Sequence, residues 1–244
     1  MDRRQDIHNS DIPIPCRACE ARHGGICGAL TAEELLELSK HTIKHALKPE
    51  QEVSTSRSSS QRYSNILKGV VKLSKATSDG RLQIVGLQFA PDFLGRPFGE
   101  QDELSAEAVT EVGVCTFPKS VLNQLMDKSP GLERRLYKQS LRELEEARSW
   151  MLTLGRKNAQ EKVVSFLCLL ATHADPELQD DSNKAAFEIP LKRSDIADFL
   201  GLTIETVSRQ ITKLRHAGLI TLTDNRFVEI PDLAKLQDLA ESGT

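Results

Sequence analysis

Three of the five cysteines lie close together near the N-terminus of the 244-residue chain. Cys16 and Cys19 are separated by two residues, and this spacing lets both sulfurs turn toward one point, as in loops that bind a metal ion or an iron–sulfur cluster. Cys27 follows after seven more residues, and Gly24 and Gly25 let the chain fold back so that its sulfur can reach the same centre. The pattern therefore predicts three converging thiolates and a fourth ligand from elsewhere in the chain.

The fourth ligand has two candidates, whose sequence contexts differ. Cys168 lies in the apolar helical stretch Val163–Leu170, where a cysteine usually serves as a small buried hydrophobic side chain. Cys115 ends a strand-like alternation and is the better candidate. Four thiolates suit either a tetrahedral zinc ion or an iron–sulfur cluster, and the spacing does not choose between them. Disulfides are disfavoured by the odd cysteine count and the lack of a signal peptide, and unligated thiols crowded in a charged loop would be prone to oxidation.

The composition is that of a soluble globular protein with room for two domains. The formal net charge of −3 argues against a non-specific polycationic nucleic-acid binder. No stretch approaches the roughly 20 apolar residues of a membrane span, so we expect a cytoplasmic protein with no membrane partner. We find no paired nucleophile and base, no phosphate-binding loop and no paired carboxylates, so an enzyme is not expected.

The segment that must carry the fourth cysteine has the pattern of an antiparallel β-domain. Strands and turns prevail over Leu47–Phe117. Strands are predicted at Leu67–Leu73 and Leu82–Leu87, on either side of a hairpin turn at Ser78–Gly80. This alternation predicts a β-roll, or jelly-roll, sensor domain.

Helical patterns precede and follow this β-domain. Thr31, with Glu34 three residues later, predicts a capping box for a short helix that ends at about His41. A much longer helix is predicted at Pro130–Arg156, about 40 Å long at 1.5 Å per residue. Along it, residues recur at spacings of three and four, the pattern of a coiled-coil seam: Tyr137, Ser140, Leu144, Ala147, Met151 and Leu154. We expect this seam to form a parallel homodimer, and its small residues to make the pairing weak enough to be switched.

The C-terminal part has the pattern of a winged helix-turn-helix. A short helix is predicted at Ser194–Leu200, followed by a tight turn at Gly201–Leu202. Thr203 is a suitable N-cap for a second helix at Ile204–Ala217. The stretch 219–230 then alternates around a polar turn, as the hairpin of a wing would.

Three polar residues near the start of the second helix share one face, namely Glu205, Ser208 and Arg209. In a major groove, arginine donates two hydrogen bonds to guanine, and glutamate accepts one from the amino group of cytosine or adenine. We therefore predict that this face reads the bases of double-stranded DNA.

On these features the chain resembles the CRP/FNR superfamily of bacterial transcription regulators, and in particular its FNR-type, oxygen-responsive branch. The resemblance covers nearly the whole chain, with a β-roll, a long dimerisation helix and a winged helix in that order. Its most specific segment is Leu200–Arg209, which contains the family's E-x-x-S-R recognition signature. The resemblance implies a homodimeric activator that binds palindromic promoter sites of the TTGAT...ATCAA type, with RNA polymerase as a further partner.

The resemblance also implies a cofactor. It assigns Cys16, Cys19, Cys27 and Cys115 as the ligands of a [4Fe-4S] cluster that assembles without oxygen, promotes dimerisation and DNA binding, and is degraded by oxygen. The C-x2-C-x7-C spacing is similar to that of the alphaproteobacterial subgroup. A regulator of the same fold with a zinc ion or no metal, answering to another signal, is the alternative.

A cyclic nucleotide is not expected as a ligand. The cyclic-AMP-binding branch carries a glutamate, and then an Arg-Ser pair, after a β-roll glycine. Here Gly95 is followed by Arg96–Pro97, and Leu104–Ser105 stands where the Arg-Ser pair would be expected. The arginine that would anchor the phosphate is therefore missing.

Together these patterns predict an α+β chain in four segments. These are a cysteine-rich segment (1–30), the β-roll (31–128), the dimerisation helix (129–157) and the winged helix-turn-helix domain (158–244).

Overall fold

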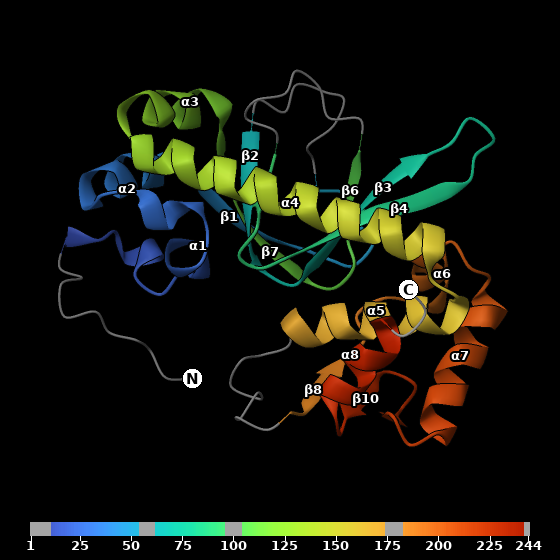
Figure 1. Cartoon of the computed structure of the whole chain (residues 1–244). Coiled ribbons are helices and arrows are strands. Elements are labelled where there is room, and N and C mark those ends of the chain that lie inside the picture. Colours follow the sequence, from blue (N-terminus) through green and yellow to red (C-terminus); the bar gives the residue numbers. More distant parts are fainter. Residues whose placement is uncertain (1–10, 54–61, 96–103, 174–182, 242–244) are drawn as a thin grey trace. The chain divides into compact units, whose positions relative to one another are not determined.

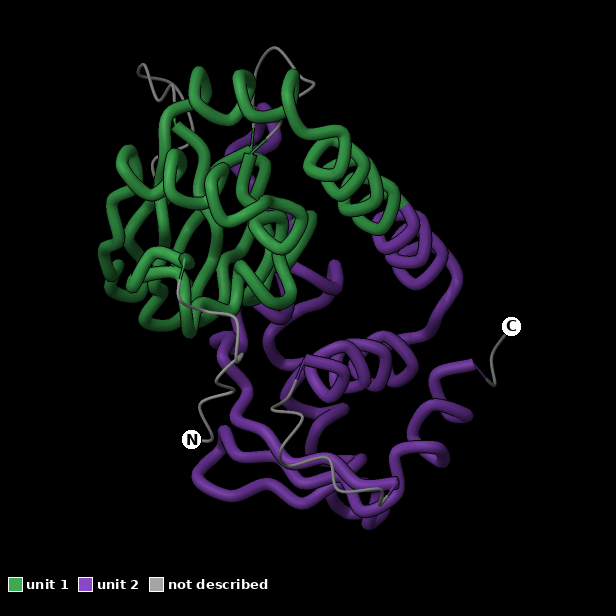
Figure 2. The backbone as a smooth tube through the Cα atoms, turned by 90° about the vertical axis from the view of Figure 1, so that its left-hand side faces the viewer, with its two compact units in different colours: residues 1–75, 85–144 green, residues 76–84, 145–244 purple. Residues whose placement is uncertain are grey.

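The computed structural model describes residues 11–53, 62–95, 104–173 and 183–241, and it has the predicted α+β fold (Figure 1). Two compact units are present (Figure 2), namely residues 1–75 with 85–144 and residues 76–84 with 145–244. The boundary between the two units falls inside the long helix and coincides with none of the boundaries of the four predicted segments. The division into four segments therefore stays a prediction. Arg96–Pro97, used above to argue against cyclic nucleotides, lies outside the described residues. Within the described ranges, no helix is both long and apolar enough to cross a membrane.

The N-terminal part of the chain forms two antiparallel sheets. One has the order β1 (Ile43–Leu47), β7 (Val112–Pro118), β2 (Arg62–Lys68), β5 (Phe93–Leu94), and the other the order β4 (Leu82–Phe89), β3 (Val70–Ala76), β6 (Ser105–Ala108). Inward-facing residues of both sheets share one apolar core, in which Ile66 and Val114 of the first sheet pack with Val71 of the second. The predicted β-roll is therefore present.

The strand predicted at Leu67–Leu73 is wrong, because the chain turns at Gly69 and begins a new strand. Gly69 has a φ of +87°, which glycine adopts readily, and a Cβ there would lie 2.4 Å from a neighbouring backbone oxygen. The hairpin turn predicted at Ser78–Gly80 does join β3 to β4. The first strand, β1, begins at Ile43 rather than at the predicted Leu47.

Short helices cover the other face of the four-stranded sheet. They are η2 (Ile14–Cys16), α1 (Glu20–His23), η3 (Ile26–Ala29), α2 (Ala32–Ser39) and α3 (Lys119–Lys128). Tyr63 and Phe117 point to this face and pack in a second apolar cluster with the helices. The capping box at the start of α2 is confirmed, because Thr31 Oγ1 accepts from the Glu34 backbone N–H (3.3 Å) while the Glu34 carboxylate accepts from the Thr31 N–H (2.8 Å).

The long helix α4 (Pro130–Arg156) has the predicted bounds. Its first turns are held to the β-domain by the buried side chains of Leu132, Leu136 and Gln139. From Ser140 to Ser149, in contrast, every residue is exposed. The helix therefore leaves the core that it starts from.

The second unit contains the predicted helix-turn-helix. Its elements are α5 (Ala159–His173), β8 (Ala185–Glu188), α6 (Arg193–Leu200), α7 (Ile204–His216), β9 (Thr221–Thr223), β10 (Phe227–Ile230) and α8 (Leu233–Glu241). Gly201, with a φ of +60°, ends α6 in the left-handed conformation that a tight turn requires. The hairpin of β9 and β10 is the predicted wing, and β8 adds a third strand to it. Neither β8 nor α8 was predicted.

Aromatic side chains hold α6 in this unit. Phe199 packs on Trp150 with ring centroids 4.5 Å apart and on Phe166 at 6.1 Å. The tip of the β3–β4 hairpin also belongs to this unit, and its Gln83 Nε2 donates a hydrogen bond to the Phe199 carbonyl oxygen (3.3 Å). The first helix of the helix-turn-helix is thus held by packed aromatic side chains.

Candidate functional site

Four of the cysteines line one cavity in the first unit. They are Cys16 on η2, Cys19 just before α1, Cys27 on η3 and Cys115 on β7. The other lining residues are Ala21, Arg22, Leu35, Leu38, Ser39, Thr42, Lys44 and Asn65. Cys168 lies instead on α5, in the second unit. The structure therefore brings together the four cysteines that the sequence singled out.

The register of the sheet explains how Cys115 faces this cavity. β7 lies between β1 and β2, and Cys115 pairs with Lys44 on one side and with Asn65 on the other. Directly opposed residues of antiparallel strands project to the same face, and this is the helix-covered face to which Phe117 also points. Lys44, Cys115 and Asn65 thus lie side by side across the sheet, and they present an amine, a thiol and an amide to the N-terminal loop.

Close backbone packing holds the cysteine loop on this face. Gly25 is buried, and a Cβ there would lie 2.7 Å from the Pro91 carbonyl oxygen and 2.8 Å from that of Ala21. Glycine is therefore required here for close approach, since both Gly24 and Gly25 have negative φ angles, of −104° and −91°. Two charged side chains tie down the loop, since Arg135 of α4 donates to the Gly24 carbonyl oxygen (2.6 Å) and Lys44 donates to that of the residue before Cys16.

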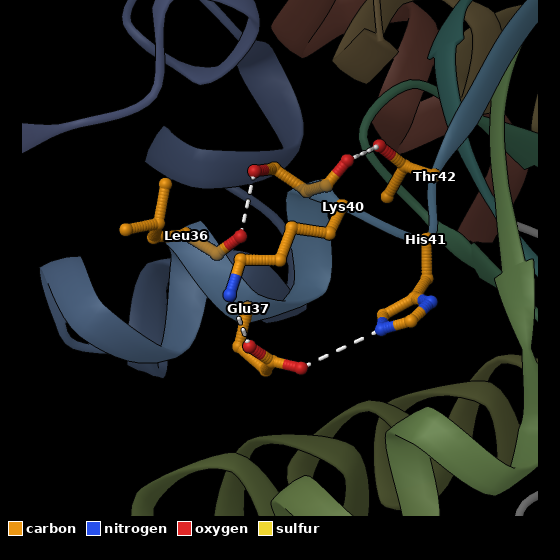
Figure 3. Close-up of polar contacts among 6 residues, drawn as sticks. Leu36, Glu37, Lys40, His41 and Thr42 are labelled. Atoms are coloured by element: carbon orange, nitrogen blue, oxygen red, sulfur yellow. Dashed lines mark hydrogen bonds and ion pairs between the residues drawn. The ribbon is translucent and has the colours of Figure 1, made fainter.

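Polar contacts surround the C-terminal end of α2 (Figure 3), and Thr42, just beyond it, lines the cavity. Glu37 pairs with Lys40 at 2.8 Å and with His41 at 3.5 Å, while Thr42 Oγ1 donates to the Ser39 carbonyl oxygen (3.0 Å). The ion pairs are exposed and contribute little individually. Ser39, the last residue of α2, and Thr42, three residues later, both line the cavity.

Burial sets the protonation of the cysteines. The pKa of Cys27 is raised to about 12, chiefly by burial and also by the three other cysteines of the site, while the hydrogen bond from Asn65 acts against the shift. Burial also raises the pKa of Cys115 to about 11 and that of Cys16, with Lys44 acting against both shifts. The sulfurs therefore lie near enough to act on one another. Ligation by thiolates at neutral pH must release protons.

The donor set fits an iron–sulfur cluster. Cysteine thiolates are the usual ligands of such clusters, one on each iron of a [4Fe-4S] centre. Among the described residues, no three cysteine, histidine or carboxylate side chains are arranged to hold a metal ion, and four cysteines can ligate either one zinc ion or an iron–sulfur cluster. The buried oxygen Oδ1 of Asn65, which lines the cavity, has no hydrogen-bond partner. The site thus has four cysteine sulfurs that could ligate a cluster and a buried polar atom that the protein leaves unsatisfied.

The predicted seam lies on the exposed part of α4. Tyr137, Leu144 and Met151 are 51%, 45% and 73% exposed, Ser140 and Ala147 are also exposed, and Leu154 is half-buried. The sequence analysis missed two exposed apolar residues of the same helix, Leu141 and Leu152. Large apolar side chains exposed along one helix mark a surface for a partner.

The start of α7 presents the predicted DNA-reading residues to solvent. Glu205, Ser208 and Arg209 are all exposed, whereas Val207 between them is buried. Thr203 caps the helix, with its hydroxyl accepting from the Thr206 backbone N–H (3.2 Å). The free N-terminal end of a recognition helix is the part that contacts base edges in helix-turn-helix proteins.

A half-buried arginine, Arg193, bonds the wing to the helix-turn-helix. Asp224 and Asn225 have φ angles of +51° and +59°, as in a two-residue hairpin turn. Arg193, at the start of α6, donates from Nη2 to the Asn225 carbonyl oxygen (3.1 Å), and partial burial lowers its pKa. The wing tip is therefore bonded to the helix-turn-helix itself.

The sequence analysis missed four residues that build the cysteine site, namely Thr42, Lys44, Asn65 and Arg135. Lys44 lies on β1, a strand that was predicted to begin only at Leu47. A polar residue at a strand position that should be buried was the one available signal for Asn65.

Comparisons with known proteins agree with this architecture. Residues 161–239 match the model of the Crp-like helix-turn-helix domain. The chain is 49% identical to a probable transcriptional activator of Rhizobium leguminosarum bv. viciae over 96% of both chains. It is 36% identical to the transcriptional activator protein FnrL of Cereibacter sphaeroides, covering 93% of this chain and 92% of the relative. The solved structure of FixK2 from Bradyrhizobium japonicum superposes with a TM-score of 0.71 at 29% identity, covering 81% of this chain and 96% of that one.

Proposed function

Because the chain belongs to the CRP/FNR family of transcription regulators, we propose that it is a homodimeric transcription activator gated by a [4Fe-4S] cluster on Cys16, Cys19, Cys27 and Cys115. One observation carries the proposal, namely that these four cysteines line a single cavity. When bound, the cluster would supply a centre that oxygen destroys. The activator role is supported by the two relatives described above, both of which carry that name.

Arg135 provides a physical link from the cysteine loop to the dimer helix. It bonds to the carbonyl of Gly24, between Cys19 and Cys27, and it lies two residues before Tyr137, the first residue of the seam. While the cysteine loop is held against Cys115, the Gly24 carbonyl oxygen stays within reach of Arg135. When the loop is released, this hydrogen bond is lost. Coupling of this kind is typically worth about 1–3 kcal/mol, which is enough to move a weak monomer–dimer equilibrium.

Dimerisation then prepares the DNA-binding surface. Two copies of α7 would lie about 34 Å apart and enter successive major grooves. We propose that Arg209 reads guanine and that Glu205 reads the paired cytosine or a neighbouring adenine. We propose sites of the TTGAT...ATCAA type, with RNA polymerase as the further partner of an activator.

The test is DNA binding with and without oxygen. A fluorescently labelled TTGAT...ATCAA duplex is titrated under argon with protein reconstituted with iron and sulfide, and the titration is repeated after exposure to air. Wild-type protein should bind under argon and lose affinity in air. Arg209→Ala should weaken binding under both conditions and relax the preference for guanine.

The cysteines provide matched variants for this test. Cys115→Ser should abolish the difference between argon and air, whereas Cys168→Ser should leave it intact. An undiminished oxygen response in Cys115→Ser would contradict the ligand assignment. Equal binding by wild-type protein under both conditions, with no iron present, would favour the zinc or metal-free alternative.

A further inference from the structure

Asn65 is a polar side chain at the centre of the cysteine site. It lies on β2 between Cys115 of β7 and Phe93 of β5, and it is 1% exposed. Positions of this kind in a central strand are normally apolar, and the residues that share its face, Tyr63 and Phe117, are aromatic. The amide is therefore an exception that needs a reason.

The two ends of this amide have different surroundings. Nδ2 donates a hydrogen bond to Cys27 Sγ at 3.3 Å, while the buried Oδ1 has no partner. A buried acceptor without a partner destabilises a fold, and an apolar side chain of the same shape avoids that penalty. For the stability of the sheet alone, a leucine would serve as well or better.

The bond to Cys27 has a use if Cys27 is a ligand. A thiolate has no proton and can only accept hydrogen bonds, and the amide presents a donor to it in a dry environment where such bonds are strong. Hydrogen bonds to cysteine sulfurs are among the features that set the properties of iron–sulfur centres. Asn65 already occupies the position from which such a bond is made.

We propose that Asn65 is a positioning residue of the iron–sulfur centre. It donates its Nδ2–H to the Cys27 thiolate, and this hydrogen bond, rather than the stability of the fold, is the reason for an amide at this position of the sheet. The inference rests on the proposed function. It concerns a different residue from the ligands, and its loss leaves all four cysteines in place.

The experiment compares full-length wild type, Asn65→Leu and Ser64→Ala, each reconstituted with iron and sulfide under argon. Ser64 is the matched control, because it is the neighbouring buried polar residue of β2 and projects to the opposite face. Three quantities are measured: the rate at which a ferrous chelator removes the centre, the reduction potential of the loaded protein, and the melting temperature of the metal-free protein.

For Asn65→Leu we expect loss to the chelator roughly 2- to 10-fold faster than in wild type, as removal of one such hydrogen bond implies. Its reduction potential should be lower, since a hydrogen bond to sulfur stabilises the more negative state. The metal-free variant should melt at the wild-type temperature or above it, because the unpartnered Oδ1 is gone. Ser64→Ala should match wild type in the first two measurements.

The outcomes separate this inference from the function on which it rests. If wild type takes up no iron and sulfide, both are overturned. If wild type is loaded and Asn65→Leu loses its centre at the same rate and has the same potential, only the role of Asn65 is overturned. A melting temperature that falls in the metal-free Asn65→Leu protein would also overturn it, since the amide would then serve the fold.

Discussion

Replacement of Met151 by alanine should weaken the dimer without harming the monomer. Full burial of a methionine side chain contributes about 1.5–3 kcal/mol. Met151 is 73% exposed, so about 1–2 kcal/mol per protomer remains to be gained at an interface. Each dimer contains the residue twice, which gives about 2–4 kcal/mol and an increase in the dimer Kd of about 30- to 700-fold.

Sedimentation equilibrium under argon, over a series of protein concentrations, measures this Kd directly. Leu152→Ala is the matched control, because Leu152 is 53% exposed on the same helix but lies outside the predicted seam. We expect a much smaller change in Kd for this control and unchanged melting temperatures for both variants. An unchanged Kd in Met151→Ala, or an equal effect of Leu152→Ala, would refute the seam.

Three further predictions concern single side chains. Thr203→Ala removes the N-cap of α7 and should lower the stability of the C-terminal unit by about 1 kcal/mol, seen as a lower melting temperature; no change would contradict the capping role. Arg135→Ala should retain iron and sulfide but reduce the difference in dimer Kd between argon and air, and an undiminished difference would show that coupling runs elsewhere. Burial raises the pKa of Cys168 from 9.0 to about 11, so at pH 8 its thiolate fraction should be about 100-fold below that of an unperturbed thiol, and mass spectrometry should show slow alkylation by iodoacetamide. Rapid alkylation would contradict the raised pKa of this half-buried thiol.

Local sequence signals predicted much of the fold. The capping box at Thr31 and the bounds of the helix Pro130–Arg156 depend on neighbouring residues, and both are confirmed. The strand predicted at Leu67–Leu73 failed because apolar residues continue across Gly69, and only the packed structure shows that the backbone turns there. α8 was missed although local signals for it exist, since Asp232 accepts from the Lys235 backbone N–H as an N-cap does, and Leu236 and Ala240, four residues apart, are both buried.

The candidate site, like the fold, has a part that local sequence signals predict and a part that they do not. Cys16, Cys19 and Cys27 were found from spacing, and Cys115 from its context. Which side chains surround them depends on strand register, and register across β1, β7 and β2 joins residues far apart in the chain. The pairing that sets an amide beside Cys115 could not be predicted without knowing where β1 and β2 begin.

The measurement that tests the central claim most directly is the iron and sulfide content of protein purified without oxygen, with its absorption spectrum followed as air is admitted. The account predicts about four irons and four sulfides per chain, as a [4Fe-4S] centre requires, with a broad visible band that bleaches in air. It also predicts that Cys115→Ser lacks the band and that Cys168→Ser keeps it. A colourless protein that contains zinc or no metal, yet still binds the TTGAT...ATCAA duplex, would contradict the cluster and leave the DNA-binding assignment standing.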